Sequence, residues 1–184
     1  MKSQHQVVLS LGSNQGQRLE TIIQCIDVLH LEVGTVLKIS PVYESPAWGF
    51  ESTPFYNCAL VLHTTASPSQ VLSKILKIEK RLGRVRTATV GYAARSIDID
   101  IIAYDEIVLD SEKLKLPHPL LQDRNFVLLP FRDLQLNWIH PIFKKSVPEL
   151  IVETIDNSIC QAVATIPTPL SSIPLEKFNY IAFE

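Results

Sequence analysis

Cysteine is scarce in this chain of 184 residues, and its few copies are far apart. The three cysteines are Cys25, Cys58 and Cys160. An odd number at wide spacing fits neither a disulfide framework nor a zinc site. Cys25 lies on the apolar side of a helical pattern and Cys58 alternates with leucines on a strand pattern, so we expect both to be small buried side chains.

An excess of charge of one sign is also lacking. The chain carries 17 Lys and Arg against 19 Asp and Glu, a net charge of −2. A near-neutral chain does not favour nucleic acid or an anionic membrane as a partner. No apolar run is long enough to cross a bilayer, and the polar start, Met1 to His5, does not resemble a signal peptide. We therefore expect a cytoplasmic protein with neither nucleic-acid nor membrane partners.

The two common phosphate-binding loops, G-x-x-x-x-G-K-[ST] and G-x-G-x-x-G, do not occur in this sequence. Strand and helix patterns alternate instead. This alternation, with long connections, predicts an α+β sandwich in which helices cover an antiparallel sheet. The predicted strands are 6–12, 36–43, 55–64 and 95–104, the last turning at 105–106 into 107–109; the predicted helices are about 22–33, 68–82, 125–134 with a break near Pro130, and 146–155.

One of these helices has clear local start and stop signals. Ser67 is suited to the N-cap, Pro68 to the first helical position, and Gln70 completes a capping-box pattern. An apolar stripe follows at helical spacing, and Gly83 ends it.

The strongest chemical signal is the acidic strand around Asp98 and Asp100. Strand alternation places both carboxylates on one face, about 7 Å apart, with Ile97, Ile99 and Ile101 on the other. Two such carboxylates repel each other unless a cation lies between them, and hard oxygen ligands suit Mg²⁺. A solvated strand face paired with arginines is the alternative. The apolar flanks favour a central strand, where unpaired charge is costly.

Basic residues surround this acidic strand. Guanidinium groups suit phosphate oxygens, and Mg²⁺ together with Arg or Lys commonly neutralises a transferring phosphoryl group. Each cation alone is most simply a surface charge, but together with the acidic strand they predict a nucleoside triphosphate site. These residues are Arg84, Arg86, Arg95, Lys113, Lys115, His118 and Arg124.

Over about its first 150 residues the chain resembles the 6-hydroxymethyl-7,8-dihydropterin pyrophosphokinases. The order and spacing of several short motifs carry the resemblance. It implies a ferredoxin-like α+β fold and the transfer of a pyrophosphoryl group from ATP to the pterin hydroxymethyl group, releasing AMP. The motifs are Leu11–Asn14, Val42–Pro46, Phe55–Asn57, Glu79 with Gly83–Arg86, Arg95–Ile102, Leu116–His118 and Arg124–Pro130.

The resemblance also implies roles for individual residues. Asp98 and Asp100 resemble the ligands of two Mg²⁺ ions, and Arg84 and Arg95 resemble catalytic cations at the phosphates. ATP is the co-substrate, and its expected contacts are Glu79, Arg86, Tyr92, Ile101, Lys113, Lys115, His118 and Arg124. The expected pterin contacts are Ser45, Pro46, Trp48, Gly49, Phe55, Asn57, Tyr92 and Phe126.

The sequence departs from the family pattern just before the acidic strand. Gly91–Arg95 lacks one basic residue of the usual motif, and the loop Arg86–Ala94 is one residue longer than usual. Two long segments, Pro46–Pro54 and Arg84–Ala94, are expected to close over the substrates. From the residues alone, Asn57 is as readily a polar strand-edge residue, and Phe126 is more readily a core residue.

Two other functions share single features with this chain. A D-x-D glycosyltransferase would also bind Mg²⁺ and a nucleotide, but usually in a longer chain with a parallel sheet. A ferredoxin-like RNA-binding module would show exposed aromatic residues on its sheet and a basic charge balance. Here carboxylates occupy the sheet face, and no basic excess exists.

The C-terminal part differs in composition from the rest. We expect a pyrophosphokinase domain at 1–160 and a linker and tail at 161–184, because 165–174 is rich in proline and serine. The strand-like run 177–184 resembles the opening of a deoxynucleoside kinase. One interpretation is a second domain that starts here in a longer fused protein, its first strand having little to pair with. The other is a native tail that adds a strand or lies disordered.

Overall fold

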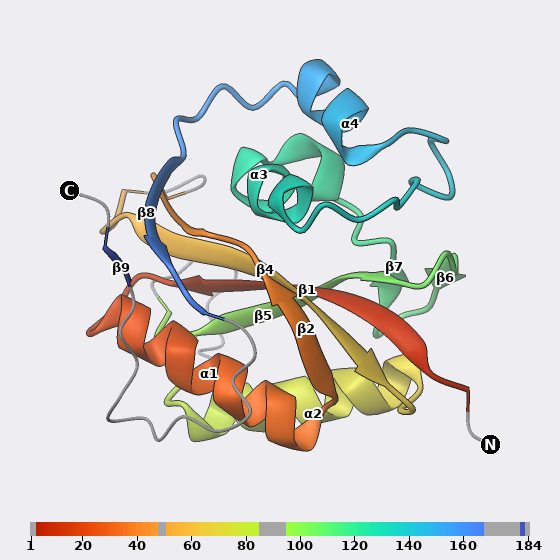
Figure 1. The fold of residues 1–184 in the computed structure, drawn as a ribbon, viewed down its shortest axis with the longest axis horizontal. Coiled ribbons are helices and arrows are strands. Elements are labelled where there is room, and N and C mark those ends of the chain that lie inside the picture. The colour runs from red at the N-terminus through yellow and green to blue at the C-terminus, as the bar shows by residue number, and fades with distance from the viewer. Residues whose placement is uncertain (1–2, 48–50, 85–94, 168–180, 183–184) are drawn as a thin grey trace.

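The computed structural model describes residues 3–47, 51–84, 95–167 and 181–182, and it shows one seven-stranded sheet with helices on both faces (Figure 1). The sheet strands are β1 (His5–Ser13), β2 (Thr35–Ile39), β3 (Val42–Ser45), β4 (Phe55–Thr64), β5 (Asp98–Tyr104), β8 (Gln161–Thr165) and β9 (Ile181–Ala182). The helices are α1 (Arg18–Glu32), α2 (Pro68–Arg81), α3 (Asn125–Asp133) and α4 (Val147–Glu153), with a short hairpin of β6 (Leu109–Asp110) and β7 (Lys115–Leu116) and a 3-10 turn at Leu121–Asp123.

The sheet runs in the order β5-β1-β4-β3-β8-β9, and β2 also pairs with β4. Every strand pair is antiparallel. The register places Gly12 of β1 between Asp98 of β5 and Asn57 of β4. The α+β class expected from the sequence is confirmed. Strands β5 and β1 are the first two in the strand order, and β5 carries Asp98 and Asp100.

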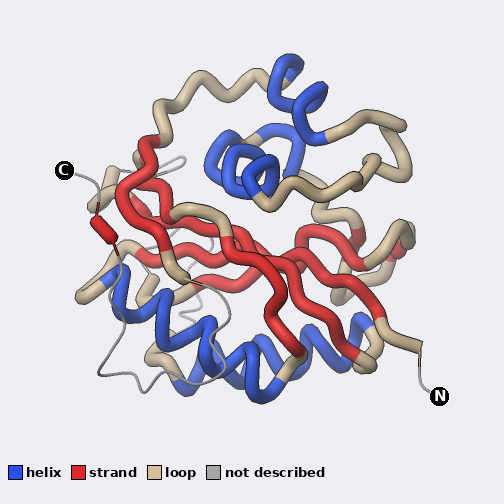
Figure 2. Tube along the Cα trace, in the orientation of Figure 1, coloured by secondary structure: helices blue, strands red, loops and turns tan. Residues whose placement is uncertain are grey.

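Two apolar cores hold the layers together, one on each sheet face (Figure 2). On one face α1 and α2 bury Ile26 and Ile75 against Leu9 and Leu11. On the other face α3 and α4 bury Phe131 against the sheet. Full burial of each such side chain contributes about 1.5–3 kcal/mol. Helices therefore pack on both faces of the sheet.

The capping signals of α2 form as predicted. Ser67 Oγ accepts from the Gln70 backbone N–H at 3.4 Å, and the Gln70 side chain accepts from the Ser67 N–H at 2.8 Å. The same reciprocal arrangement starts α4, where the Glu149 carboxylate accepts from the Ser146 N–H at 2.7 Å. Local sequence therefore fixes where both helices begin.

The single strand predicted over 36–43 is wrong, because the structure has two strands there, β2 and β3. The break falls at Ser40 and Pro41. Proline has no N–H to donate to a ladder. At the break the Ser40 hydroxyl makes the local hydrogen bonds: it accepts from the Ala59 N–H at 2.9 Å and donates to the Pro41 carbonyl at 2.7 Å. The chain stays beside β4 but changes its register there.

Two further local predictions need correction. The segment after β5 does not pair back onto it; β6 pairs with β7 instead. Asp105, at φ 46°, turns the chain out of the sheet, and its N–H donates to the Gln6 carbonyl at 2.8 Å. The break expected at Pro130 is absent, since α3 continues through it to Asp133. Pro130 lies inside this helix and is buried, together with Val127, Leu128 and Phe131.

The C-terminal segment joins the sheet. Strand β8 lies within the range expected to be linker and tail, yet it pairs with β3 and buries Ala164 and Ile166. Ile181 and Ala182 in turn pair with β8. The other terminal residues considered above, 168–180 and 183–184, lie outside the described residues.

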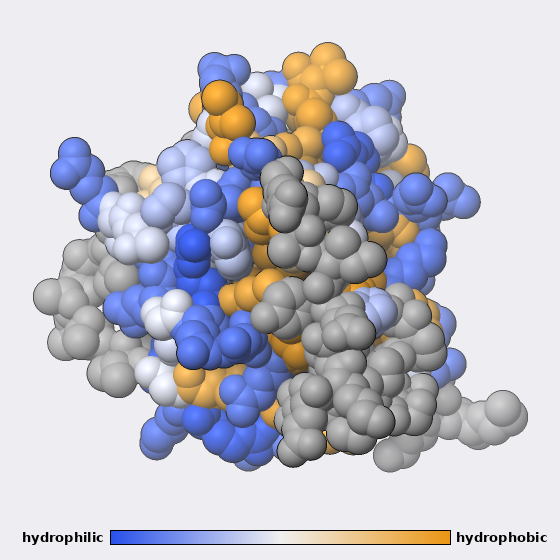
Figure 3. All heavy atoms as spheres, turned by 60° about the vertical axis from the view of Figure 1, so that its left-hand side comes forward, coloured by the Kyte–Doolittle hydropathy of each residue, from blue (hydrophilic) through white to orange (hydrophobic). Residues whose placement is uncertain are grey.

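Apolar residues are exposed around α4 and the connection that follows it. Val152, Ile155 and Ile159 are each more than 80% exposed. Figure 3 shows hydrophobic residues at the top of the molecule, at the height where α4 lies in Figure 1. In the described part of the chain, no helix has the length and apolar character needed to cross a membrane.

Candidate active site

The two carboxylates predicted to share a face do so. Ile99 and Ile101 of β5 are buried in the core beneath α1 and α2, so Asp98 and Asp100 face the opposite side of the sheet. Next to them in β1 lie Gly12, opposite Asp98, and Ser10, opposite Asp100. The floor of the candidate site is therefore the face of β5, β1, β4 and β3 that α3 leaves partly uncovered.

Arginines from two segments meet the acidic strand. The Arg84 guanidinium bonds both Glu79 and Asp98, and the Arg95 guanidinium bonds the second oxygen of Asp98. Glu79, at the end of α2, is 1% exposed and also accepts from the Ile99 N–H at 2.9 Å. Buried ion pairs of this kind add little net stability, because desolvation offsets their attraction. We interpret the cluster as a functional arrangement of charge.

Asp100 has a different environment from Asp98. The pKa of the Asp100 carboxyl is raised to about 7, mainly by burial and also by the charges of Asp98 and Glu79, while Arg124 and Arg84 act in the opposite direction. Among the described residues no hydrogen bond or ion pair to the Asp100 side chain is formed. Asp98 and Asp100 are two neighbouring carboxylates, and only Asp98 is bonded to arginines in the described part of the chain. Such a pair attracts a further cation.

The side chains around Asp98 and Asp100 determine which metal ion the site suits. No group of three or more His, Cys, Asp or Glu side chains in the described part of the chain is arranged to hold a metal ion. Mg²⁺ does not need such a group, because it commonly binds one or two carboxylates and completes its shell with water and substrate phosphates. Asp98 and Asp100 fit that pattern.

His118 and Arg124 lie on the same side of the sheet. The pKa of the His118 imidazole is lowered to about 4, mainly by burial and also by the charge of Arg124, while Asp98 acts in the opposite direction. His118 is therefore neutral near pH 7. Arg124 is 8% exposed, and its guanidinium lies 5.6 Å from the centre of the Phe126 ring.

Three of the residues expected to contact the pterin, Ser45, Phe55 and Asn57, lie in the neighbouring strands β3 and β4. Asn57 and Ser45 are both buried, and the Asn57 amide donates to Ser45 Oγ at 2.8 Å. A Cβ at Gly12 would lie 3.0 Å from Asn57 Oδ1 and 3.7 Å from the Phe55 ring. Gly12 therefore keeps the floor low between the carboxylates and Asn57. Pro46, at the end of β3, is exposed.

Several expected site residues are not part of this cluster. Lys115 is exposed and pairs with Asp110 at 2.9 Å, and Lys113 lines a shallow groove beside α2. The Ile101 side chain is buried in the core on the other sheet face. Trp48, Gly49, Arg86 and Tyr92, and much of the two segments expected to close, lie outside the described residues.

The end of β1 holds residues for which the sequence predicted no role, although they lie in the motif Leu11–Asn14. Gly12 forms the floor, and the Ser13 hydroxyl donates to the Ser96 carbonyl at 2.6 Å. Asn14 bonds three other chain positions through its amide. The sequence signal was the glycine followed by two small polar residues directly after a buried strand.

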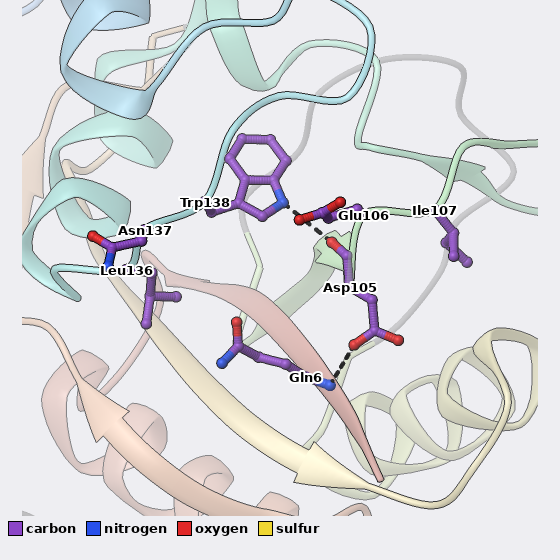
Figure 4. Close-up of a pocket in the computed structure, with 7 residues that line it drawn as sticks. All are labelled: Gln6, Asp105, Glu106, Ile107, Leu136, Asn137 and Trp138. Carbon is purple, nitrogen blue, oxygen red and sulfur yellow. Dashed lines mark hydrogen bonds between the residues drawn. The ribbon is translucent and has the colours of Figure 1, made fainter. Parts of the chain in front are cut away.

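A second hollow lies at the opposite end of β5 (Figure 4). It has a volume of about 720 Å³ and includes Gln6, Asp105 and Trp138 in its lining. The Trp138 indole donates to the Asp105 carbonyl at 3.2 Å. Its charged lining residues are Asp105 and Glu106, both acidic, so it does not suit a polyphosphate.

Comparison with known proteins gives consistent matches. Residues 8–136 match the family described as 7,8-dihydro-6-hydroxymethylpterin-pyrophosphokinase. The 2-amino-4-hydroxy-6-hydroxymethyldihydropteridine pyrophosphokinase of Aquifex aeolicus is 41% identical over 155 residues, which are 84% of this chain and 95% of that protein. The folic acid synthesis protein fol1 of Pneumocystis carinii is 37% identical over 83% of this chain, which spans only 20% of that longer protein.

Solved structures support the fold. A Plasmodium falciparum HPPK-DHPS triple mutant superposes with a TM-score of 0.66 at 14% identity, over 83% of this chain and 44% of that one. A second HPPK-DHPS, solved with substrates, gives 0.69 at 12% identity, over 89% and 47%. Together with the sequence matches, these results show that the chain belongs to the 7,8-dihydro-6-hydroxymethylpterin pyrophosphokinase family, which transfers pyrophosphate from ATP to hydroxymethyldihydropterin in folate biosynthesis.

Proposed function

We propose that this chain carries out its family's pyrophosphate transfer on the sheet face formed by the starts of β5 and β4 and the ends of β1 and β3, with Mg²⁺ held by Asp98 and Asp100. The observation that carries the proposal is the Asp100 carboxylate. It lies close enough to Asp98 and Glu79 for their negative charges to raise its pKa. When bound, two Mg²⁺ ions would neutralise the triphosphate and favour ionisation of the substrate hydroxyl.

Arg84 and Arg95 are proposed to bind the ATP phosphates from two sides of the acidic strand. A guanidinium carries five N–H donors, so pairing through Nη1 with Asp98 does not exhaust it. The pairing fixes both side chains beside the place where phosphate oxygens would lie. Their charge would then stabilise the negative charge that develops on the leaving AMP. Arg124 supports the same region, while neutral His118 can act there as a hydrogen-bonding group.

The pterin is proposed to lie over Gly12, between Asn57 and Phe126. The Asn57 amide group donates to Ser45, and its oxygen remains directed toward the floor near Gly12, where it can accept from the edge of the heterocycle. Phe126, half-buried at the start of α3, offers an aromatic face for stacking. This arrangement places the pterin beside the carboxylates, and its hydroxymethyl group toward the phosphates.

The test is AMP release from ATP that depends on the pterin and on Mg²⁺. Asp98→Ala and Asp100→Ala should lower turnover by at least about 100-fold, a loss typical of removing charge stabilisation from a transition state. Asp110→Ala is the matched control, because this exposed carboxylate pairs only with Lys115 among the described residues. Near-normal AMP release by both site variants would contradict the metal assignment.

A further inference from the structure

Asn14 lies at the end of β1 and is 3% exposed, and both polar atoms of its amide are engaged. Its Oδ1 accepts from the backbone N–H of Arg95 at 2.7 Å. Its Nδ2 donates to Ser52 Oγ at 3.0 Å and to the Thr53 carbonyl at 3.2 Å. Its own backbone N–H donates to the Arg95 carbonyl at 3.1 Å. One side chain therefore joins two segments that are distant in sequence.

The two segments serve opposite sides of the site. Arg95 carries the guanidinium that bonds Asp98, on the side proposed for the phosphates. Ser52 and Thr53 lead into β4, which starts with Phe55 and carries Asn57 on the pterin side. The adjoining Pro54 carbonyl accepts from Arg18 Nη1 at 2.7 Å, so the entry to β4 is held from a second direction.

We propose that Asn14 is a positioning residue that holds the phosphate side and the pterin side of the site in register. The inference rests on the proposed function of those two sides. The task needs an acceptor and a donor in one short side chain, and an amide supplies both. Alanine supplies neither. Aspartate keeps the acceptor for Arg95 but cannot donate to the Thr53 carbonyl.

The two substitutions should therefore affect the two substrates differently. Asn14→Ala should weaken binding of both a non-hydrolysable ATP analogue and the pterin, by about five- to tenfold each, as expected for loss of a buried hydrogen bond. Asn14→Asp should weaken pterin binding by a similar factor and leave ATP-analogue binding within about twofold, because the bond to Arg95 remains. A purely structural role would lower both affinities together in both variants.

Ser52→Ala tests the bond between Asn14 and the pterin side of the site by removing the acceptor, Ser52 Oγ. Ser52 is exposed, so its loss removes the hydroxyl acceptor without opening the core. It should weaken pterin binding by about threefold, with no change for the ATP analogue. In the Asn14→Ala background the same substitution should add nothing, because the bond it removes no longer exists.

The matched control is Thr64→Val at the far end of β4. Thr64 is 4% exposed, and its hydroxyl donates to the Val33 carbonyl at 2.6 Å and accepts from the Ala66 N–H at 3.1 Å. It thus joins backbone segments as Asn14 does, but away from the site. Its loss should lower the melting temperature and leave both affinities unchanged.

The affinities are measured by calorimetry, with melting temperature recorded for each variant. The inference would be overturned if the affinities of Asn14→Ala lay within twofold of those of Thr64→Val. It would also be overturned if the effect of Ser52→Ala persisted in the Asn14→Ala background. If Asn14→Ala does not fold, the substrate-selective losses in Asn14→Asp and Ser52→Ala decide it, and equal or absent effects overturn it. Binding is measured directly. A wild-type protein that binds both ligands but releases no AMP would therefore contradict the proposed function and leave the inference about Asn14 untouched.

Discussion

Burial and neighbouring charge act in the same direction on Asp100. The carboxyl is surrounded by protein and faces Asp98 and Glu79, so its charged form is disfavoured and its pKa rises to about 7. An unfolded chain would release this proton near the ordinary aspartate value, 3.8. Between those two values the folded state binds more protons than the unfolded state, so stability falls as pH rises through this window. The site residue therefore costs the metal-free protein stability at neutral pH.

Asp100→Asn should remove that cost. Each unit of pKa shift corresponds to about 1.4 kcal/mol, and relaxation around a coupled carboxyl reduces the effect, so we expect a gain on the order of 1–3 kcal/mol at pH 8 in EDTA. At pH 4 the variant and the wild type should be equally stable. Denaturant unfolding at both pH values measures the difference, and exposed Asp110→Asn serves as the control.

Adding Mg²⁺ extends the same measurement. A cation that binds the folded state stabilises it by mass action, so Mg²⁺ should raise wild-type stability at pH 8 and raise that of Asp100→Asn less. Equal stability of the two proteins at pH 8 without metal would show that Asp100 is not held under charge repulsion. The variant should gain stability while losing turnover, which separates a functional residue from a packing residue.

At the scale of single residues, the sequence predicted which carboxylates share a sheet face better than it predicted the side-chain bonds around them. Alternation along one strand is enough to place Asp98 and Asp100 on the same face, because the period of a strand is fixed. The bonds of Arg84 to both Glu79 and Asp98 depend on the end of α2 meeting β5, which local sequence does not encode. The neutral state of His118 depends likewise on burial by distant segments. Asn14 was part of a quoted motif, but its partners are 38 and 81 residues away.

Helix α2 connects local sequence signals to the site. Its capping box fixes the N-terminus at Ser67, and its apolar stripe of Val71, Ile75 and Ile78 holds it on the sheet. Its C-terminal turn then places Glu79 against the Ile99 N–H. The helix start contributes to stability and the helix end to the site, so the two roles are separable by substitution.

Ser67→Ala should lower the free energy of unfolding by about 1 kcal/mol, because the substitution leaves an N-terminal backbone N–H without its side-chain acceptor. Turnover at 25 °C should stay within about twofold, since apolar packing still positions Glu79. Ser73→Ala, on the exposed face of the same helix, is the control and should be neutral or slightly stabilising. Denaturant unfolding and the AMP assay give the two readouts. A large loss of turnover in Ser67→Ala would mean that the cap positions the site.

Elements with strong local signals were predicted well, and elements defined by long-range pairing were not. The bounds of β4 and the start of α2 agree with the structure, since both rest on alternation or capping. The pattern over 36–43 does not predict the break between β2 and β3, because both strands pair with the same neighbour, β4, and only their register differs. Strand β8 was assigned to a linker region, because only its pairing with β3 identifies it as part of the sheet.

On the scale of the whole molecule, the sheet is enclosed by helices on both faces and extended at one edge by the C-terminal segment (Figure 1). Several relatives are longer fused proteins, and this chain spans 20% of fol1 from Pneumocystis carinii. A deoxynucleoside kinase-like domain after residue 184 stays a prediction, which the sequence of the parent gene decides. The division between a domain at 1–160 and a tail at 161–184 also stays a proposal, and it can be tested by stability.

Strand β8 contributes to the main core through Ile166, which follows it and is 5% exposed. Ile166→Ala should lower the free energy of unfolding by about 2–4 kcal/mol, because a buried isoleucine loses its transfer energy and leaves a cavity. Ile159→Ala, seven positions earlier and 83% exposed, is the matched control and should change stability by less than about 0.5 kcal/mol.

Removal of residues 161–184 should cost at least as much as Ile166→Ala, because β3 then also loses its hydrogen-bonded neighbour. Since β3 ends at Ser45, which binds Asn57, the shortened protein should also bind the pterin more weakly while it remains folded. Denaturant unfolding and pterin calorimetry measure the two effects. A shortened protein with wild-type stability and pterin affinity would place the domain boundary at 160. A loss in both would extend the domain through β8, because the strand next to β3 would then support the pterin side of the site.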